Sequence, residues 1–182
     1  MTAVVGLVKD GKVWLGADSA ATWGDFTQSL LAERKIFRRG PLLFGTCGDL
    51  RPADILRVNL EVPYHDPDKY ETAYHFMVAC VVEAIRACLS AGGSVKKKNE
   101  VEPIPSVFLV GYSGHLFTIE EDLSCQEAGE TYLAIGSGAN VATGALHATK
   151  GRSPKPRILA ALAAAAHHNA SVRAPFYVEV LG

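Results

Sequence analysis

Apolar residues come in short runs separated by turn residues, and the first two runs lie at the start of the chain. Residues 3–8 and 12–17 are rich in valine and leucine and barely alternate with polar residues. This pattern is typical of strands that are covered on both faces. Asp10 and Gly11 between the runs are a strong signal for a hairpin turn. We therefore predict that the chain opens with a buried β-hairpin.

The length of the hairpin loop determines which side chains share a face of the sheet. A two-residue loop at Asp10-Gly11 pairs Thr2 with Ser19 and places Asp18 on the opposite face, because side chains alternate along a strand. A three-residue loop or a bulge pairs Thr2 with Ala20 and brings Thr2 and Asp18 diagonally together. Both registers fit the sequence, and we expect a site shared by Thr2 and Asp18 to require the second.

The rest of the pattern predicts alternating groups of strands and helices. Further strands are predicted at residues 35–38, 42–47, 106–112, 115–119, 131–135 and 172–181. Helices are predicted at residues 52–60, 139–149 and 157–168, and a long amphipathic one from the cap at Asp66-Pro67 to the stop at Gly92-Gly93. This order indicates an α+β fold, a four-layer αββα sandwich of two packed antiparallel sheets flanked by helices. The 182 residues are expected to form one domain, 1–182.

Composition and charge limit the classes of binding partner and the cellular compartment that we expect for this protein. The chain is 48% hydrophobic and 20% charged, with a formal net charge of −1, so we expect neither a nucleic-acid nor a membrane partner. No signal-peptide pattern and no apolar run of about 20 residues is present. The four cysteines lack the spacing of a metal site, and Glu120–Asp122 have no histidine partner, so we expect no metal and no cofactor. Free thiols and the missing export signal predict a cytoplasmic protein.

Thr2 brings candidate chemistry to the hairpin. Met1 is readily removed when the next side chain is as small as that of Thr2, and removal leaves an α-amine and a β-hydroxyl on one residue. A free α-amine has a pKa of about 7.7–8.0. Such an amine can act as the general base for its own hydroxyl, which makes Thr2 a candidate nucleophile.

Five short segments, in this order along the chain, carry a resemblance to a known family. They are Thr2-x-x-Val-Gly, then Gly16-Ala17-Asp18-Ser19 with Thr22 and Gly24, then Lys35-Ile36, then Gly45-Thr46-Cys47-Gly48 with Ala53-Asp54, and Ala134-Ile135-Gly136-Ser137-Gly138 with Gly144-Ala145-Leu146. Together they resemble the proteasome β-subunit and HslV family of N-terminal-nucleophile (Ntn) hydrolases. The resemblance runs nearly the whole chain, and the length is more similar to HslV or a bacterial proteasome homologue than to a eukaryotic subunit.

The resemblance implies catalytic roles for five residues. Thr2 matches the nucleophile, Asp18 the carboxylate beneath it, and Lys35 the lysine that this carboxylate pairs with. An ammonium group near the α-amine favours the neutral, basic form of that amine. Gly48 matches the glycine whose backbone N–H helps to bind the oxyanion, and Ser137 matches the serine that contacts the terminal amine.

The resemblance also implies a substrate pocket. Ala21, Thr46 and Leu50 fall near the positions that line the pocket for the residue before the cleaved bond. These three residues predict a small-to-apolar rather than an acidic pocket.

One stretch and two positions depart from the family pattern. The stretch between Thr22 and Lys35 is one residue longer than usual, so Arg34 competes with Lys35 as the matching cation. Asn169, a supporting residue in this scheme, stands where the family has aspartate, and Val172 stands where it has serine.

The resemblance and its departures indicate three possible functions, and a glycine motif suggests a fourth. The first is a threonine peptidase in a homo-oligomeric ring that degrades peptides or unfolded proteins delivered by an ATP-dependent unfoldase. The second is an Ntn amidohydrolase acting on a small amide, and the third is a weak or inactive ring subunit. A dinucleotide-binding module is suggested by Gly136-x-Gly138, but position 141 is valine and no acid follows at the required distance.

Overall fold

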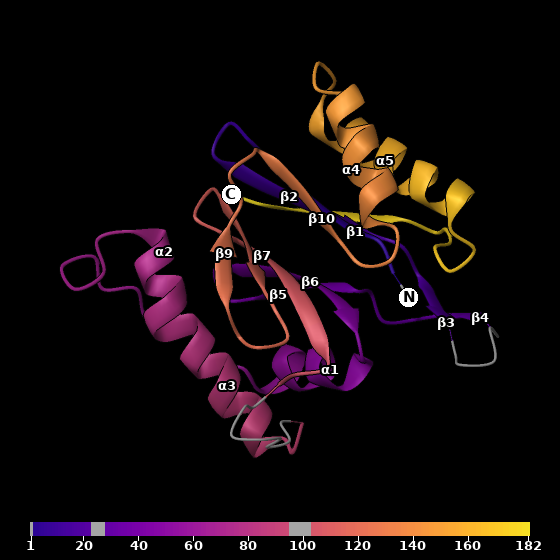
Figure 1. The fold of residues 1–182 in the computed structure, drawn as a ribbon. Helices are drawn as coiled ribbons and strands as arrows, with labels where there is room; N and C mark the ends of the chain where they lie inside the picture. Colours follow the sequence, from indigo (N-terminus) through magenta and orange to yellow (C-terminus); the bar gives the residue numbers. More distant parts are fainter. Residues whose placement is uncertain (1, 23–27, 95–102) are drawn as a thin grey trace.

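The computed structural model describes residues 2–22, 28–94 and 103–182. Met1 and the lysine run at 96–98, which we expect in an exposed loop, lie outside the described residues. Two antiparallel sheets form the middle of the molecule, and helices lie on their outer faces (Figure 1).

The first sheet contains the predicted hairpin. Its strands, in spatial order, are β10 (Tyr132–Ile135), β1 (Val4–Lys9), β2 (Lys12–Ala17) and β11 (Tyr177–Leu181). The sheet is covered on both faces, as the unbroken apolar runs predict. Ala3, Val5 and Leu7 pack toward helices, whereas Val4 packs toward the second sheet.

The hairpin register differs from the one that we expected a shared site to require. The loop has two residues, with Lys9 opposite Lys12 and Val4 opposite Ala17. The Asp18 amide still donates to the Ala3 carbonyl at 3.2 Å, but the Ala3 amide donates to Asp18 Oδ1 at 3.1 Å rather than to a backbone carbonyl. The expectation is wrong because it applied regular strand alternation to Asp18, which follows the last residue of β2. There the Asp18 carboxylate bends toward β1 and accepts a hydrogen bond from the Ala3 amide.

The second sheet and a small third one complete the β-structure. The five strands of the second sheet, in spatial order, are β5 (Ile36–Arg39), β6 (Leu42–Gly48), β7 (Ser106–Tyr112), β8 (His115–Ile119) and β9 (Cys125–Glu127). The short strands β3 (Ala20–Thr22) and β4 (Gln28–Leu30) pair with each other. Strands β3, β4 and β9 are absent from the sequence prediction, since three residues are too few for a periodic pattern.

Helices cover the outer face of each sheet. Over the second sheet lie α1 (Leu50–Asn59) and a continuous helix built from α2 (Ala73–Phe76), η1 (Met77–Val81) and α3 (Val82–Ala91). Over the first sheet lie α4 (Ala139–Ala148) and α5 (Pro154–His168). The described residues therefore form the four-layer αββα sandwich that the sequence predicts.

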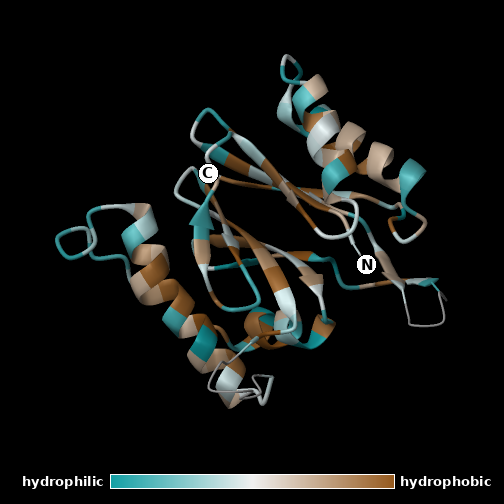
Figure 2. Cartoon of the chain, viewed as in Figure 1, coloured by the Kyte–Doolittle hydropathy of each residue, from teal (hydrophilic) through white to brown (hydrophobic). Residues whose placement is uncertain are grey.

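Each interface between layers has its own apolar cluster. Phe44, Phe108 and Ile85 belong to the cluster beneath α1–α3, and Leu7, Ile158 and Leu162 belong to the cluster beneath α4 and α5. Val4 and Leu109 lie between the two sheets. Figure 2 shows apolar residues concentrated along the strands and on the long helix.

The long helix begins later than predicted. Its N-cap is Thr72, whose hydroxyl accepts a hydrogen bond from the His75 amide at 3.1 Å. Asp66 instead closes a turn by accepting from the Asp68 amide at 3.1 Å. The Asp-Pro signal thus marks a turn that precedes the helix.

The same helix is long and apolar enough, by length and composition alone, to cross a membrane. Its 19 residues, Ala73–Ala91, have a mean hydropathy of 1.4 over the most apolar window. Phe76, Met77 and Ile85 on this helix are fully buried against the second sheet. Length and composition alone do not separate a core helix that packs on a sheet from a helix that spans a membrane.

The last predicted strand is shorter than expected. Strand β11 begins at Tyr177, five residues after the predicted start at Val172. The residues between α5 and β11 form a loop that runs past the start of β1, and this loop becomes part of the site.

Candidate active site

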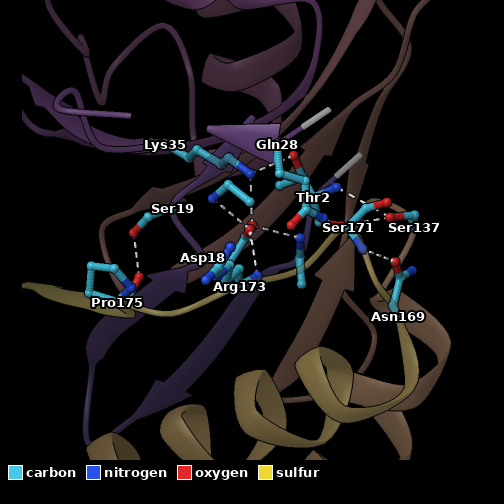
Figure 3. Close-up of polar contacts among 12 residues, drawn as sticks. Thr2, Asp18, Ser19, Gln28, Lys35, Ser137, Asn169, Ser171, Arg173 and Pro175 are labelled. Carbon is cyan, nitrogen blue, oxygen red and sulfur yellow. Dashed lines mark hydrogen bonds and ion pairs between the residues drawn. The ribbon is translucent and has the colours of Figure 1, made fainter. Parts of the chain in front are cut away.

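Thr2, Lys35 and Asp18 meet at one end of the first sheet (Figure 3). Lys35 Nζ donates to Thr2 Oγ1 at 3.0 Å and to Asp18 Oδ1 at 2.8 Å. All three side chains are buried, with exposed fractions of 4%, 3% and 0% for Thr2, Lys35 and Asp18. The structure therefore brings together the hydroxyl, the cation and the carboxylate that the sequence nominates.

The carboxylate of Asp18 is held by four donors. Oδ1 accepts from Lys35 Nζ and from the Ala3 amide, and Oδ2 accepts from the amides of Ala20 at 3.0 Å and Arg173 at 3.2 Å. A carboxylate with four donors is fully satisfied although it is shielded from water. Asp18 is thus a fixed anion that holds Lys35 in place.

The protonation of Lys35 depends on two opposing effects. Burial lowers the pKa of the Lys35 ammonium from its ordinary value, and the charge and hydrogen bond of Asp18 partly oppose this effect. The lowered pKa makes the Lys35 ammonium a stronger acid than that of an exposed lysine, whereas its contact with Asp18 favours the charged form. Next to Thr2, such a cation stabilises negative charge that develops on Oγ1.

The turn between β10 and α4 holds the backbone of Thr2. The Thr2 amide donates to Ser137 Oγ at 3.2 Å, and the Gly138 amide donates to the Thr2 carbonyl at 3.2 Å. Gly136 has a φ of +93°, and a Cβ there would lie 2.3 Å from the Thr2 carbonyl oxygen. The glycine-rich turn is therefore fitted to Thr2, which gives it a role other than binding a dinucleotide.

Gly48 ends β6 near the site, and local packing alone requires a glycine there. Its φ is +103°, and a Cβ would lie 2.5 Å from the Pro105 carbonyl oxygen. The predicted contribution of its N–H to an oxyanion site stays a prediction. The neighbouring Cys47 is an unsuitable nucleophile, because burial raises the pKa of its thiol to about 11.

A cavity of about 250 Å³ opens beside Lys35. Its buried part includes Lys35, Thr46 and Ala53, and its exposed rim includes Glu33. The remaining lining residues are Leu31, Ala32, Arg34, Leu50, Asp54 and Arg57. Thr46 and Leu50 thus line one cavity, together with two carboxylates and three cations, and their role in binding a substrate side chain stays a prediction.

Two other sequence expectations have a clear geometric outcome. Ala21 lies on β3 and is not among the described residues that line this cavity. Arg34 pairs with Glu179 at 3.1 Å and stacks on Tyr177 at 4.5 Å, with about half of its side chain exposed. Lys35, rather than Arg34, is therefore the cation next to Thr2.

The loop after α5 brings a serine close to the site that the sequence analysis did not name. Asn169 Oδ1 accepts from the Ser171 amide at 3.0 Å, whereas Val172 is buried beneath α4 and α5. The side chain of Ser171, 5% exposed, lies beside that of Ser137 in Figure 3. Ser171 thus brings a hydroxyl to this region one residue before Val172, the position at which the sequence analysis looked for a serine.

Strand β4 is tied to the same loop. The Gln28 amide nitrogen donates to the Ala170 carbonyl, and the Ser19 hydroxyl donates to the Pro175 carbonyl. The loop is therefore fixed from both sides of the site. Within residues 2–22, 28–94 and 103–182, no three histidine, cysteine, aspartate or glutamate side chains are grouped so that they could hold a metal ion.

Comparison with known proteins identifies the fold. Neither protein-family models nor curated protein sequences give a match. Among solved structures, BPH from Thiobacillus denitrificans has a TM-score of 0.77 at 22% identity and covers 100% of this chain and 99% of its own. HslV from Trypanosoma brucei has a TM-score of 0.72 at 18% identity, covering 98% of each chain. Anbu from Yersinia bercovieri has a TM-score of 0.66 at 16% identity, covering 98% of this chain and 81% of its own.

These similar structures are all proteasome-like proteins of the Ntn type. The sequence resemblance pointed to the same group from five short segments. The chain therefore has the fold of the HslV-like, proteasome-like Ntn hydrolases.

Proposed function

We propose that this protein is a threonine peptidase of the cytoplasm that uses Thr2, after removal of Met1, as its nucleophile. The observation that carries the proposal is the buried chain of contacts from Thr2 Oγ1 to Lys35 Nζ and on to Asp18. A buried cation–carboxylate pair is expensive to desolvate. Buried charged groups of this kind are concentrated at functional sites, and this pair lies directly beneath the Thr2 hydroxyl.

The first step forms an ester between the substrate and Thr2. The α-amine of Thr2 takes the proton of Oγ1 as Oγ1 attacks the substrate carbonyl carbon. The positive charge of Lys35, 3.0 Å from Oγ1, stabilises the negative charge that develops on the attacking oxygen. The protonated α-amine then gives its proton to the leaving nitrogen as the carbon–nitrogen bond breaks.

The second step returns the enzyme to its starting state. A water molecule attacks the ester carbonyl while the α-amine accepts a proton from that water, and Thr2 Oγ1 leaves and is reprotonated. In both steps the carbonyl oxygen carries negative charge, for which we propose the Gly48 N–H as a donor. Loss of one such donor costs on the order of 10²–10³ in rate in other hydrolases.

Ser137 holds the nitrogen that would act as the base. In the intact chain this nitrogen is the Thr2 amide, and it donates to Ser137 Oγ at 3.2 Å. A free amine in the same place would keep this contact, which orients its lone pair relative to Oγ1. Ser171 lies beside Ser137, so we propose that both hydroxyls orient the amine.

We further propose that copies of this chain form a ring that receives peptides or unfolded proteins from an ATP-dependent unfoldase. The support is the likeness to HslV and Anbu, the latter described as an ancestral β-subunit. BPH has been solved in complex with epoxomicin. We therefore expect epoxomicin to inhibit this protein.

The test compares two substitutions of one residue. Thr2→Ala removes the hydroxyl and is expected to lower kcat for short fluorogenic peptides by on the order of 10⁴-fold or more. Thr2→Ser keeps both a hydroxyl and an amine, and we expect it to stay within about 10²-fold of wild type. Equal rates for wild type and Thr2→Ala would exclude Thr2 from the reaction.

A further inference from the structure

The segment between β4 and β5 brings Lys35 to the nucleophile with little backbone support of its own. At its two ends the Leu31 amide donates to the Ser19 carbonyl at 2.9 Å, and the Thr46 amide donates to the Lys35 carbonyl at 3.0 Å. Between these anchors, residues 32–34 make no backbone–backbone hydrogen bond to another described residue. The position of Lys35 therefore depends on the side chains that hold this segment.

The guanidinium of Arg57, near the end of α1, holds this segment from one side. Its Nη1 donates to Glu33 Oε2 at 2.7 Å, and its Nη2 donates to the Arg34 carbonyl. Its Cζ lies 4.9 Å from the centre of the Phe37 ring. Arg57 thus contacts the two residues before Lys35 and the second residue after it.

Of these three contacts, the bond to the Arg34 carbonyl is the one that fixes the segment. The side chain of Glu33 is 79% exposed, so its ion pair with Arg57 contributes little. The side chain of Arg57 is only 22% exposed and packs over Phe37, which is buried. A guanidinium that is already packed in this way loses little further freedom when it donates to a carbonyl.

The side chain of Arg34 ties the same segment to the first sheet. It pairs with Glu179 at 3.1 Å and lies over Tyr177 at 4.5 Å, and both partners are on β11. Arg34 is therefore held by β11 through its side chain and by α1 through its carbonyl. Because the peptide bond is planar, fixing the Arg34 carbonyl also fixes the direction in which the chain enters Lys35.

We propose that Arg57 is a positioning residue that keeps the Lys35 ammonium in contact with Thr2. Lys35 Nζ lies 3.0 Å from Thr2 Oγ1 and 2.8 Å from Asp18 Oδ1. A displacement of about 1 Å takes both contacts beyond the length of a hydrogen bond. The inference rests on the proposed peptidase function, and it adds a residue that acts through Lys35 rather than on the reacting atoms.

The first experiment compares the kinetics of substitutions at two arginines of α1. Arg57→Gln shortens the side chain and removes the donor to the Arg34 carbonyl, so we expect kcat for a fluorogenic peptide to fall about tenfold. Arg57→Lys keeps a cation with a donor and should recover part of this loss. Arg51→Gln is the matched control, because Arg51 Nη2 also donates to a carbonyl outside the helix, that of Gly92 at 2.8 Å. It should leave kcat unchanged.

The second experiment measures the accessibility of Lys35 and needs no peptidase activity. Lys35 is buried, so acetic anhydride should modify it slowly in wild type, whereas Lys9 and Lys12 are exposed and should react fast. Mass spectrometry of fragments should show that Arg57→Gln speeds the labelling of Lys35 severalfold and leaves Lys9 and Lys12 unchanged. Arg51→Gln should leave all three lysines unchanged. Hydrogen exchange in the central strand β7 reports general opening and should be the same in wild type and both variants.

The outcomes separate this inference from the peptidase function. Wild-type protein that hydrolyses no peptide, combined with faster labelling of Lys35 in Arg57→Gln, would contradict the function and still support the positioning of Lys35 by Arg57. Labelling of Lys35 at the wild-type rate in Arg57→Gln, or equal effects of Arg57→Gln and Arg51→Gln, would overturn the role of Arg57. Faster exchange throughout β7 in Arg57→Gln would also overturn it, because the substitution would then act by loosening the whole fold. If Arg57→Gln does not fold, Arg57→Lys is compared in the same way, with a smaller change expected.

Discussion

Lys35 determines the electrostatics of the candidate site at the scale of single residues. Its ammonium contacts both the Thr2 hydroxyl and the Asp18 carboxylate, and burial lowers its pKa from the ordinary value of 10.5. Its charge also favours the neutral form of a nearby α-amine. Two titrations therefore limit the range of pH in which the site holds a neutral amine above a charged lysine.

We predict a bell-shaped dependence of kcat/KM on pH. The rate should rise as the Thr2 α-amine loses its proton, at or below its ordinary pKa of about 7.7–8.0. It should fall at alkaline pH when Lys35 loses its proton, and the lowered pKa of Lys35 places this fall below pH 10.5. Initial rates with a fluorogenic peptide from pH 5 to 11 provide the measurement. A rate that keeps rising to pH 11 would contradict a charged Lys35 in the reaction.

The sequence predicted most of the residues that meet at the site, but it could not predict how Asp18 reaches it. Thr2, Lys35 and Ser137 lie together because they follow or precede strands whose pattern is clear. The orientation of Asp18 depends on hydrogen bonds from Ala3, Ala20 and Arg173, which come from three separate segments. Strand alternation carries no information on such contacts beyond the end of a strand.

At the scale of elements, the turn from β10 to α4 positions Thr2. Gly136 adopts a φ of +93° and lies against the Thr2 carbonyl, so its backbone and that of Thr2 are packed without space for a side chain. The turn then continues into α4 through Gly138, whose amide donates to the same carbonyl. We therefore expect the turn to affect catalysis although Gly136 has no reactive group.

Gly136→Ala should lower both stability and activity. The new Cβ would be 2.3 Å from the Thr2 carbonyl oxygen, and the left-handed backbone is strained for alanine; we expect a loss of about 1–3 kcal/mol in the free energy of unfolding. Gly144→Ala is the matched control, because Gly144 lies within α4 with no atom within 4 Å of the added Cβ. That change should stabilise the protein by about 0.5–1 kcal/mol. Urea denaturation and peptide hydrolysis measure both, and equal behaviour of the two variants would contradict this account.

Longer elements were predictable and short ones were not. The residues of β1, β2, α4 and α5 extend over at least six positions, so their apolar pattern identifies them. Strands β3 and β4 have three residues each, and they are strands because they pair with each other. The start of the long helix at Thr72 rather than Asp66 depends on which side chain caps it, and both residues are good caps.

At the scale of the whole molecule, several large apolar side chains face solvent in the single chain. They are Leu30, Leu50, Val58, Tyr64, Tyr74, Val78 and Val180, with exposed fractions between 38% and 84%. The ring proposed above would cover part of this surface, although exposed apolar residues alone do not identify an interface. We predict that the purified protein is a closed ring of 19.4-kDa subunits.

Light scattering coupled to size-exclusion chromatography should give a mass that is a multiple of 19.4 kDa, and electron micrographs should show rings. A monomer that hydrolyses small amides would contradict the ring and favour an amidohydrolase. A ring without peptide hydrolysis would instead favour a subunit that has a structural role.

The central claim is that the amine and the hydroxyl of Thr2 act together in the reaction. Intact-mass spectrometry of the purified protein, run beside a peptide hydrolysis assay on the same sample, tests this claim most directly. The account predicts an active protein whose mass is lower by one methionine residue, with Thr2 at its start. A protein that keeps Met1 on every chain and still hydrolyses the peptides would contradict this claim.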